Sequence, residues 1–128
     1  AFLPHVAAHH FPGQAIVCAL YLHAGVRAVE IGQLMYGERD DTGEEQPVAL
    51  DLVRLAIPRR VYTQNHLDYA AEAVCDVHAA RAALRGLDIV SQPPVLRHFG
   101  ARLRPRAEAA AARDGAAAKP EAANVFFP

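Results

Sequence analysis

Lysine is almost missing from this chain of 128 residues. Of its 13 basic residues one is lysine, which leaves twelve arginines. The single lysine, Lys119, lies near the end, between an alanine run and Pro120. A lysine that acts as a reactive amine needs a buried site that tunes its pKa. The scarcity therefore excludes lysine chemistry from everything that precedes Lys119.

Cysteine is also scarce, with only Cys18 and Cys75, far apart and in no CxxC motif. With no secretory signal in view, this predicts free thiols in a reducing, cytoplasmic compartment. The longest apolar stretches are too short and too interrupted to span a bilayer. A net charge of −1, from 13 basic and 14 acidic residues, gives no case for nucleic acid or a membrane as partner. No glycine-rich phosphate loop is present.

The composition predicts one folded domain with an extension. Apolar residues make up 52% of the chain, which is typical of a globular protein. Residues 1–104 are predicted to form the domain, and the alanine-rich residues 105–128 a mostly disordered tail. A short helix near 108–113 and docking of Val125–Phe127 stay open for this tail. Because Ala1 opens a segment that reads like the middle of a protein, we expect a piece of something larger.

Hydrophobic periodicity and end signals predict two helices. The first begins at Pro12, whose missing N–H costs nothing in the first turn, and ends at Gly25. It places Ile16 and Leu20 on one face. The second covers residues 64–84 after the N-cap Thr63, with an apolar stripe at spacings of three and four.

Four strands are predicted, over residues 27–36, 51–57, 87–92 and 95–103. The first places Val29, Ile31 and Gln33 on one face, and a solvated acidic loop separates it from the second. The short, hairpin-like connections favour a mostly antiparallel sheet with helices on one face. The predicted fold class is therefore α+β.

Arg54 stands in the middle of the apolar strand "DLVRLAIP". Alternation places Val53, Leu55 and Ile57 on the face that lies under the helices, and Arg54 on the other face. One interpretation is a surface ion pair, which contributes little to stability. The other is an anion clamp, because the planar guanidinium offers paired donors that match a carboxylate. Periodicity alone leaves both open.

Two other groups of polar residues are not predicted to be sites. His5, His9 and His10 lie in an irregular segment without a cysteine or acidic partner, so no metal site is expected. The run Cys75–His78 contains nucleophile, acid and base, but neighbouring helix positions point in different directions.

Three stretches carry a resemblance to a known family: "FPGQAIVCALYLHAGVRAVEIG", "RLAIPRRVYTQNHLDY" and "PPVLRHFGARL". In this order, over about residues 1–104, the chain resembles the C-terminal, small-domain part of the tryptophanase and tyrosine phenol-lyase family. The resemblance implies the small domain of a pyridoxal-phosphate enzyme of fold type I, the aspartate-aminotransferase fold. It also implies that Arg54 holds the α-carboxylate of an amino-acid substrate and so orients its Cα–H bond.

Two positions bear on the leaving group of the substrate. Ile31 stands where tyrosine phenol-lyases carry an arginine for the phenol, and His98 where they carry phenylalanine. Both residues look like tryptophanase: Ile31 suits the hydrocarbon edge of indole, His98 offers polarity near its ring, and Phe99 packs around the site. A purely structural His98 stays open. Gly100 and Gly13 depart from the usual threonine and alanine, and Gly100 would loosen the strand beside His98.

The resemblance implies β-elimination of L-tryptophan to indole, pyruvate and ammonium by a homotetramer that uses pyridoxal phosphate and a potassium-type cation. Lys119 is badly placed to bond to the cofactor. A large cofactor domain, covalently linked or separate, must then supply that lysine and the phosphate site, and this chain alone should be inactive. The alternatives are a tyrosine phenol-lyase or another β-eliminating amino-acid lyase, and a stand-alone remnant that binds a carboxylate or a partner without chemistry.

Overall fold

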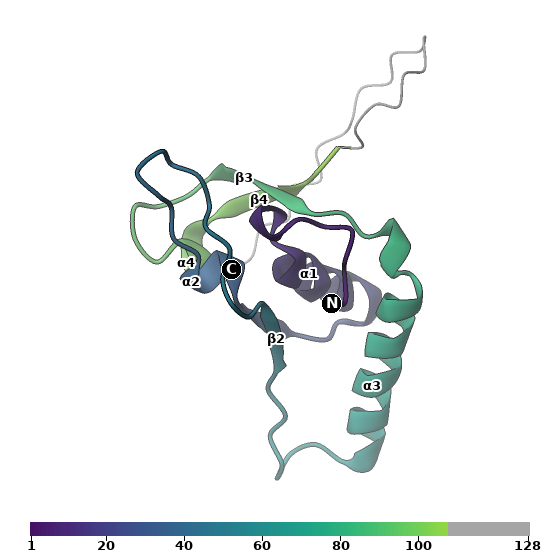
Figure 1. The fold of residues 1–128 in the computed structure, drawn as a ribbon. Coiled ribbons are helices and arrows are strands. Elements are labelled where there is room, and N and C mark those ends of the chain that lie inside the picture. Colours follow the sequence, from purple (N-terminus) through teal and green to yellow (C-terminus); the bar gives the residue numbers. More distant parts are fainter. Residues whose placement is uncertain (108–128) are drawn as a thin grey trace, which may run out of the picture.

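The computed structural model describes residues 1–107 (Figure 1). The predicted tail helix near 108–113 and the docking of Val125–Phe127 lie outside these residues. Two 3-10 turns, Ala8–His10 and Arg81–Ala83, accompany eight longer elements. These are α1 (Pro12–Ala24), β1 (Ala28–Ile31), α2 (Gln33–Tyr36), β2 (Leu52–Leu55), α3 (Gln64–Ala79), β3 (Leu87–Ser91), α4 (Arg97–Gly100) and β4 (Arg102–Pro105).

Helix α1 is the central element of the fold. It begins at Pro12, and its C-cap Gly25 has φ +66°, a left-handed conformation that glycine adopts without steric cost. Both ends are as predicted, as is the burial of Ile16 and Leu20. The helix packs against α3, β1, β2 and β3, so it contacts the other long helix and both pairs of strands.

The hydrophobic core forms where α1, α3, β3 and the N-terminal segment meet. Helix α3 starts as predicted after Thr63, whose N–H donates to His66 Nδ1 at 3.2 Å. The buried core residues are Leu3, Ala15, Ile16, Leu20, Ala73, Val77 and Leu87.

Helix α3 ends at Ala79, so its predicted extension to residue 84 is wrong. Distant contacts override the helical propensity of this alanine-rich stretch. His5 Nε2 lies 2.8 Å from the Leu84 carbonyl oxygen, and a Cβ on Gly86 would lie 2.5 Å from the Cβ of His10. The chain therefore leaves the helix early and turns toward β3.

The strands form two separate antiparallel ribbons, β1–β2 and β3–β4. The α+β class and the antiparallel pairing are confirmed, whereas a single sheet with helices on one face is wrong for residues 1–107. The reason is the position of α1, which contacts both ribbons and lies between them in Figure 1. Each ribbon therefore covers a different side of one helix.

Three strand predictions are too long. The first strand stops at Ile31 and the chain enters α2, so Gln33 is helical and does not continue the face of Val29. The last one divides into α4 and β4, which puts His98 on a helix instead of a strand. Strand β2 ends at Leu55, and Ile57 is exposed and not packed under the helices.

Both cysteines lie in helices as expected, Cys18 in α1 and Cys75 in α3, and both are free thiols. Within residues 1–107 no helix has the length and apolar character needed to cross a membrane.

Replacing Leu20 by alanine should lower the free energy of unfolding by about 2–5 kcal/mol, because the side chain is 2% exposed and its loss leaves a cavity. Leu22→Ala on the same helix is the matched control, since Leu22 is 72% exposed. Urea unfolding of the 128-residue chain, followed by circular dichroism, measures both. Equal losses for the two variants would contradict the position of α1 in the core.

Candidate functional site

The outer face of the β1–β2 ribbon brings together two of the predicted site residues. Residues opposite one another in an antiparallel pair project on the same side. The register pairs Val29 with Arg54 and Ile31 with Leu52, so Arg54 and Ile31 share this face. They were predicted from separate motifs, and the ribbon places them on neighbouring strands.

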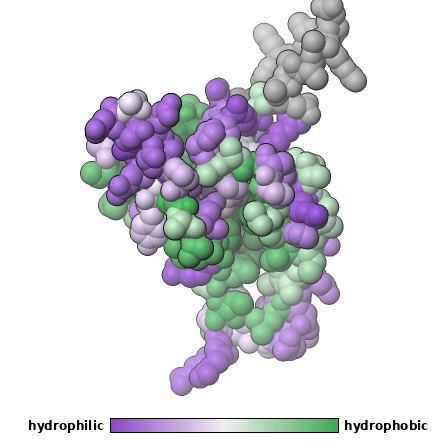
Figure 2. All heavy atoms as spheres, in the orientation of Figure 1, coloured by the Kyte–Doolittle hydropathy of each residue, from purple (hydrophilic) through white to green (hydrophobic). Residues whose placement is uncertain are grey.

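Arg54 lies exposed in an apolar setting. Val29 and Leu52, its neighbours on the outer face, are also exposed to solvent. Hydrophobic residues appear at the surface near β2, whereas the loop after α2 is mostly hydrophilic (Figure 2). Among residues 1–107 Arg54 has no hydrogen-bond or ion-pair partner. Its donors are therefore available to an anion from outside this part of the chain.

The inner face of the same ribbon carries a buried carboxyl group that sequence reasoning missed. Glu30 is 3% exposed, and its carboxylate accepts the N–H groups of Leu34 at 2.8 Å and Met35 at 3.1 Å. These bonds satisfy free donors in the first turn of α2. The available signal was a charged residue inside an apolar strand, the same signal that singled out Arg54.

Asp51 is a second carboxylate beside Glu30, at the start of β2. It accepts the N–H of Gly13 at 3.0 Å and that of Gln33 at 3.4 Å, so it holds the first turns of α1 and α2 together. A Cβ on Gly13 would lie 2.6 Å from its Oδ1, and one on Gly32 only 2.0 Å. Gly13, where the resembled family usually carries alanine, therefore leaves room for the Asp51 side chain.

The pKa of Glu30 is raised to about 7. Burial is the largest cause, and the neighbouring Asp51 carboxyl adds to it, while the N–H groups of Leu34 and Met35 oppose the shift. Near neutral pH Glu30 therefore exchanges a proton behind the face that carries Arg54 and Ile31.

His98 and Phe99 lie on α4, the single helical turn before β4. Their rings are tilted by 45° with centroids 4.1 Å apart. His98 is half-buried and lines an open hollow together with Met35, Gln92, Pro93 and Leu96. Phe99 is 81% exposed, so most of its ring is free of contacts with residues 1–107.

Arg97 joins this pair to the other half of the site and was also missed. Its Nε donates to the carbonyl oxygen of Leu34 at 2.8 Å, and its Nη2 to that of Gln33 at 2.6 Å. Gln33 follows Ile31 by two residues. The ribbon group, Ile31 and Arg54, and the α4 group, His98 and Phe99, are therefore linked through α2 and Arg97.

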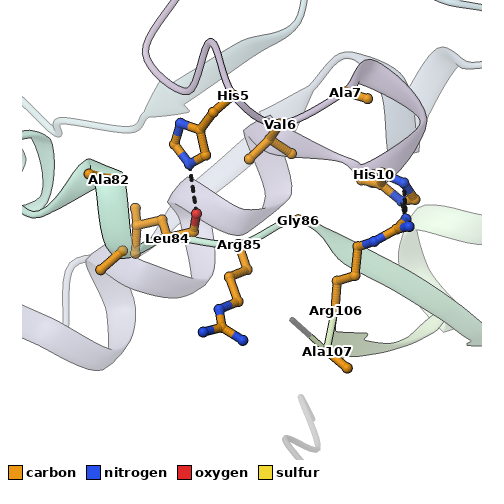
Figure 3. A pocket seen from close by; sticks show the side chains of 11 residues that line it. His5, Val6, Ala7, His10, Ala82, Leu84, Arg85, Gly86, Arg106 and Ala107 are labelled. Atoms are coloured by element: carbon orange, nitrogen blue, oxygen red, sulfur yellow. Dashed lines mark hydrogen bonds between the residues drawn. The ribbon is translucent and has the colours of Figure 1, made fainter. Parts of the chain in front are cut away.

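A second hollow contains none of the predicted site residues (Figure 3). His5 there reaches the carbonyl of Leu84, and Arg106 reaches His10. His10 Nδ1 also lies 3.3 Å from Asp88 Oδ1, so the basic groups that line this hollow are partly paired. Within the described residues, no three His, Cys, Asp or Glu side chains are close enough to hold a metal ion.

Comparison with known proteins identifies the family of this chain. The beta-eliminating lyase family matches residues 6–73, which is more than half of the chain. The chain belongs to the beta-eliminating lyase family. Enzymes of this family use pyridoxal phosphate, and the lyase-family resemblance seen in the sequence is confirmed.

The curated relatives of this lyase-family chain include tryptophanases. This chain is 55% identical over 101 residues to the tryptophanase of Hyphomonas neptunium. It is 52% identical over 102 residues to the tryptophanase of Rhodobacter capsulatus, and 48% over 107 residues to the tryptophanase of Salinibacter ruber. The matches cover 79%, 80% and 84% of this chain. They cover only 22% of each relative, so the chain spans about a fifth of their length.

The raised pKa of Glu30 predicts a pH-dependent stability. Between the ordinary pKa of 4.5 and about 7, the folded chain holds a proton that the unfolded chain has lost. The free energy of unfolding contributed by this group should therefore fall as pH rises through this window, by on the order of 2 kcal/mol. Glu30→Gln should remove this fall, as measured by urea unfolding at pH 5 and pH 8.

The matched control for this experiment is Glu44→Gln, on the exposed loop before β2. It should retain the pH dependence of the parent chain. The assignment fails if Glu30→Gln and the parent lose the same stability between the two pH values.

Proposed function

We propose that this chain is the part of a tryptophan-cleaving lyase that holds the carboxylate of the substrate and lines part of its aromatic pocket. The reaction is β-elimination of L-tryptophan to indole, pyruvate and ammonium. The observation that carries the proposal is Arg54, exposed without a partner among residues 1–107 on an apolar face that also bears Ile31. The tryptophanase relatives supply the substrate class.

Arg54 acts as a clamp on the α-carboxylate. Two parallel N–H donors hold both carboxylate oxygens, so the position and plane of the carboxylate are fixed and the bound substrate takes a set orientation. That orientation aims the Cα–H bond at the reacting centre, an effect that contributes to the rate as well as to affinity. The position of Arg54 on a paired strand suits this role, because the β1–β2 ribbon gives it a rigid base.

The aromatic pocket draws on both groups of residues. Ile31 offers an apolar surface to the hydrocarbon edge of indole, and its side chain cannot donate a hydrogen bond to a phenol. His98 offers a polar ring nitrogen, and Phe99 an exposed aromatic face. These contacts favour tryptophan over tyrosine as the substrate, so a tyrosine phenol-lyase is the less favoured assignment.

Residues 1–107 do not fit the cofactor. They contain no lysine and no glycine-rich phosphate loop, and Lys119 lies outside the described residues. A large domain, linked or separate, therefore holds pyridoxal phosphate and the potassium-type cation, and the chain alone is inactive. The proposal includes the small-domain place of this segment in fold type I, a homotetramer and a cytoplasmic location.

A non-catalytic carboxylate-binding remnant is the second candidate. The absence of lysine from residues 1–107 favours it, because the described part of the chain cannot itself bond to the cofactor. The two candidate functions predict different activities for a grafted enzyme. In it, the matching segment of this chain replaces that of the Hyphomonas neptunium tryptophanase, and indole release from tryptophan is assayed. A graft that binds pyridoxal phosphate but releases no indole would support the remnant.

In the active graft, Arg54→Ala should lower kcat/KM for tryptophan by on the order of 100-fold, because both charge-assisted bonds and the orientation are lost. Arg102→Ala is the matched control, an exposed arginine on β4, and should leave turnover unchanged. An unchanged kcat/KM in Arg54→Ala would remove the clamp assignment.

His98→Phe in the same graft should lower kcat/KM for tryptophan by about 10-fold, since a polar contact to the indole ring is lost while the ring volume is kept. Steady-state assays of indole release measure this. Turnover equal to that of the parent graft would show that His98 has only a structural role.

A further inference from the structure

Arg97 makes four side-chain hydrogen bonds beside the candidate site, although it is not itself one of the proposed substrate contacts. Besides the carbonyls of Gln33 and Leu34, it pairs with Glu45 through both guanidinium arms. Nη1 lies 2.5 Å from Oε1 and Nη2 2.9 Å from Oε2. The two side chains are only 13% and 10% exposed. Buried, bidentate pairs of this kind define a geometry more sharply than surface pairs do.

The state of Glu45 supports a permanent pair. Burial alone would raise the pKa of this carboxyl, but hydrogen bonds from Arg97 and Arg39, with the charge of Arg97, outweigh burial and lower the pKa. Glu45 is therefore ionised at neutral pH. Gln33 Nε2 approaches the same carboxylate at 3.4 Å, which ties the loop after α2 into the contact.

Helix α4 has little else to hold it in place. It is a single turn, and Val95, Leu96 and Phe99 are all exposed, so hydrophobic burial contributes little to its position. Leu96, just before it, has φ +53°, a left-handed conformation that is unfavourable for a non-glycine residue. Favourable contacts must offset this cost. The hydrogen bonds of Arg97, the next residue in the chain, are the nearest such contacts.

The surroundings of Arg97 are shaped to its guanidinium. A Cβ on Gly37 would lie 2.7 Å from Nη2, so glycine leaves the room that the group occupies. The ring of Phe11, itself buried, lies 5.7 Å from the guanidinium carbon. A lysine could carry the charge but could not reach two carbonyls and both carboxylate oxygens at once.

We propose that Arg97 is a positioning residue that sets the specificity for the leaving group. It fixes His98 and Phe99, its neighbours in α4, at a set distance from Ile31, which lies two residues before Gln33. The inference rests on the proposed function. It goes beyond it by assigning the spacing between the two groups of the aromatic pocket to one half-buried guanidinium.

The test compares two amino acids in the grafted tryptophanase. Arg97→Lys should lower kcat/KM for L-tryptophan by about 10- to 100-fold, as expected when a pocket is misplaced by about 1 Å. For S-methylcysteine, whose leaving group is small, kcat/KM should stay within about threefold, because the Arg54 clamp is untouched. A general loss of folding would lower both values together.

The matched control is Arg102→Lys. Arg102 is an exposed arginine on β4 and takes no part in the Glu45 contact. This variant should leave both values unchanged. Glu45→Gln keeps the two carbonyl bonds of Arg97, so it serves as the milder variant if Arg97→Lys does not fold. Glu45→Gln should also lower kcat/KM for tryptophan more than for S-methylcysteine, but by a smaller factor.

Hydrogen exchange gives a readout that needs no turnover. The amides of Phe99 and Ala101, bonded to the carbonyls of Leu96 and Arg97, should exchange faster in Arg97→Lys, while those of α1 stay protected. In a variant whose α1 amides stay protected, equal loss for tryptophan and S-methylcysteine, or no loss for either, would overturn the inference. A parent graft that binds cofactor but never releases indole would instead overturn the proposed function.

Discussion

Two carboxyl groups behind the β1–β2 ribbon, the buried Glu30 and the half-buried Asp51, are the constraint on which the rest of the candidate site depends. Asp51 accepts N–H groups from the first turns of α1 and α2, and Glu30 accepts two more from α2. A buried carboxylate is costly unless such donors satisfy it, so these bonds leave little freedom in where the ribbon lies. The outer face is thereby held at a fixed angle to α1, with Arg54 and Ile31 on it.

The acidic and basic groups of the β1–β2 ribbon lie on opposite faces. Glu30 and Asp51 serve the interior, where backbone donors meet them, and Arg54 faces outward with no partner among residues 1–107. Arg97 repeats the interior pattern on α4, where its partners are two carbonyls and Glu45. Arg54 is therefore left without a partner among residues 1–107, while the carboxyl groups behind it are satisfied by backbone donors.

Much of the candidate site was open to prediction from local residues. An arginine in an apolar strand marked Arg54, and the motifs around Ile31 and His98 carried the family, which the match over residues 6–73 confirms. Glu30 offered the same signal as Arg54 and was overlooked. Arg97 offered none, because its partners Gln33, Leu34 and Glu45 are more than 50 residues away along the chain.

The sequence by itself determined the elements whose causes are local. Pro12 and Gly25 bound α1, Thr63 starts α3, and alternation sorts the faces of β2. Only the tertiary structure decided where α2 and α4 interrupt predicted strands and why two ribbons form instead of one sheet. Those outcomes depend on side chains such as Asp51 and Arg97 that bond to backbone far away in sequence. No periodicity within a strand or helix records such a bond, since its energy appears only when the segments meet.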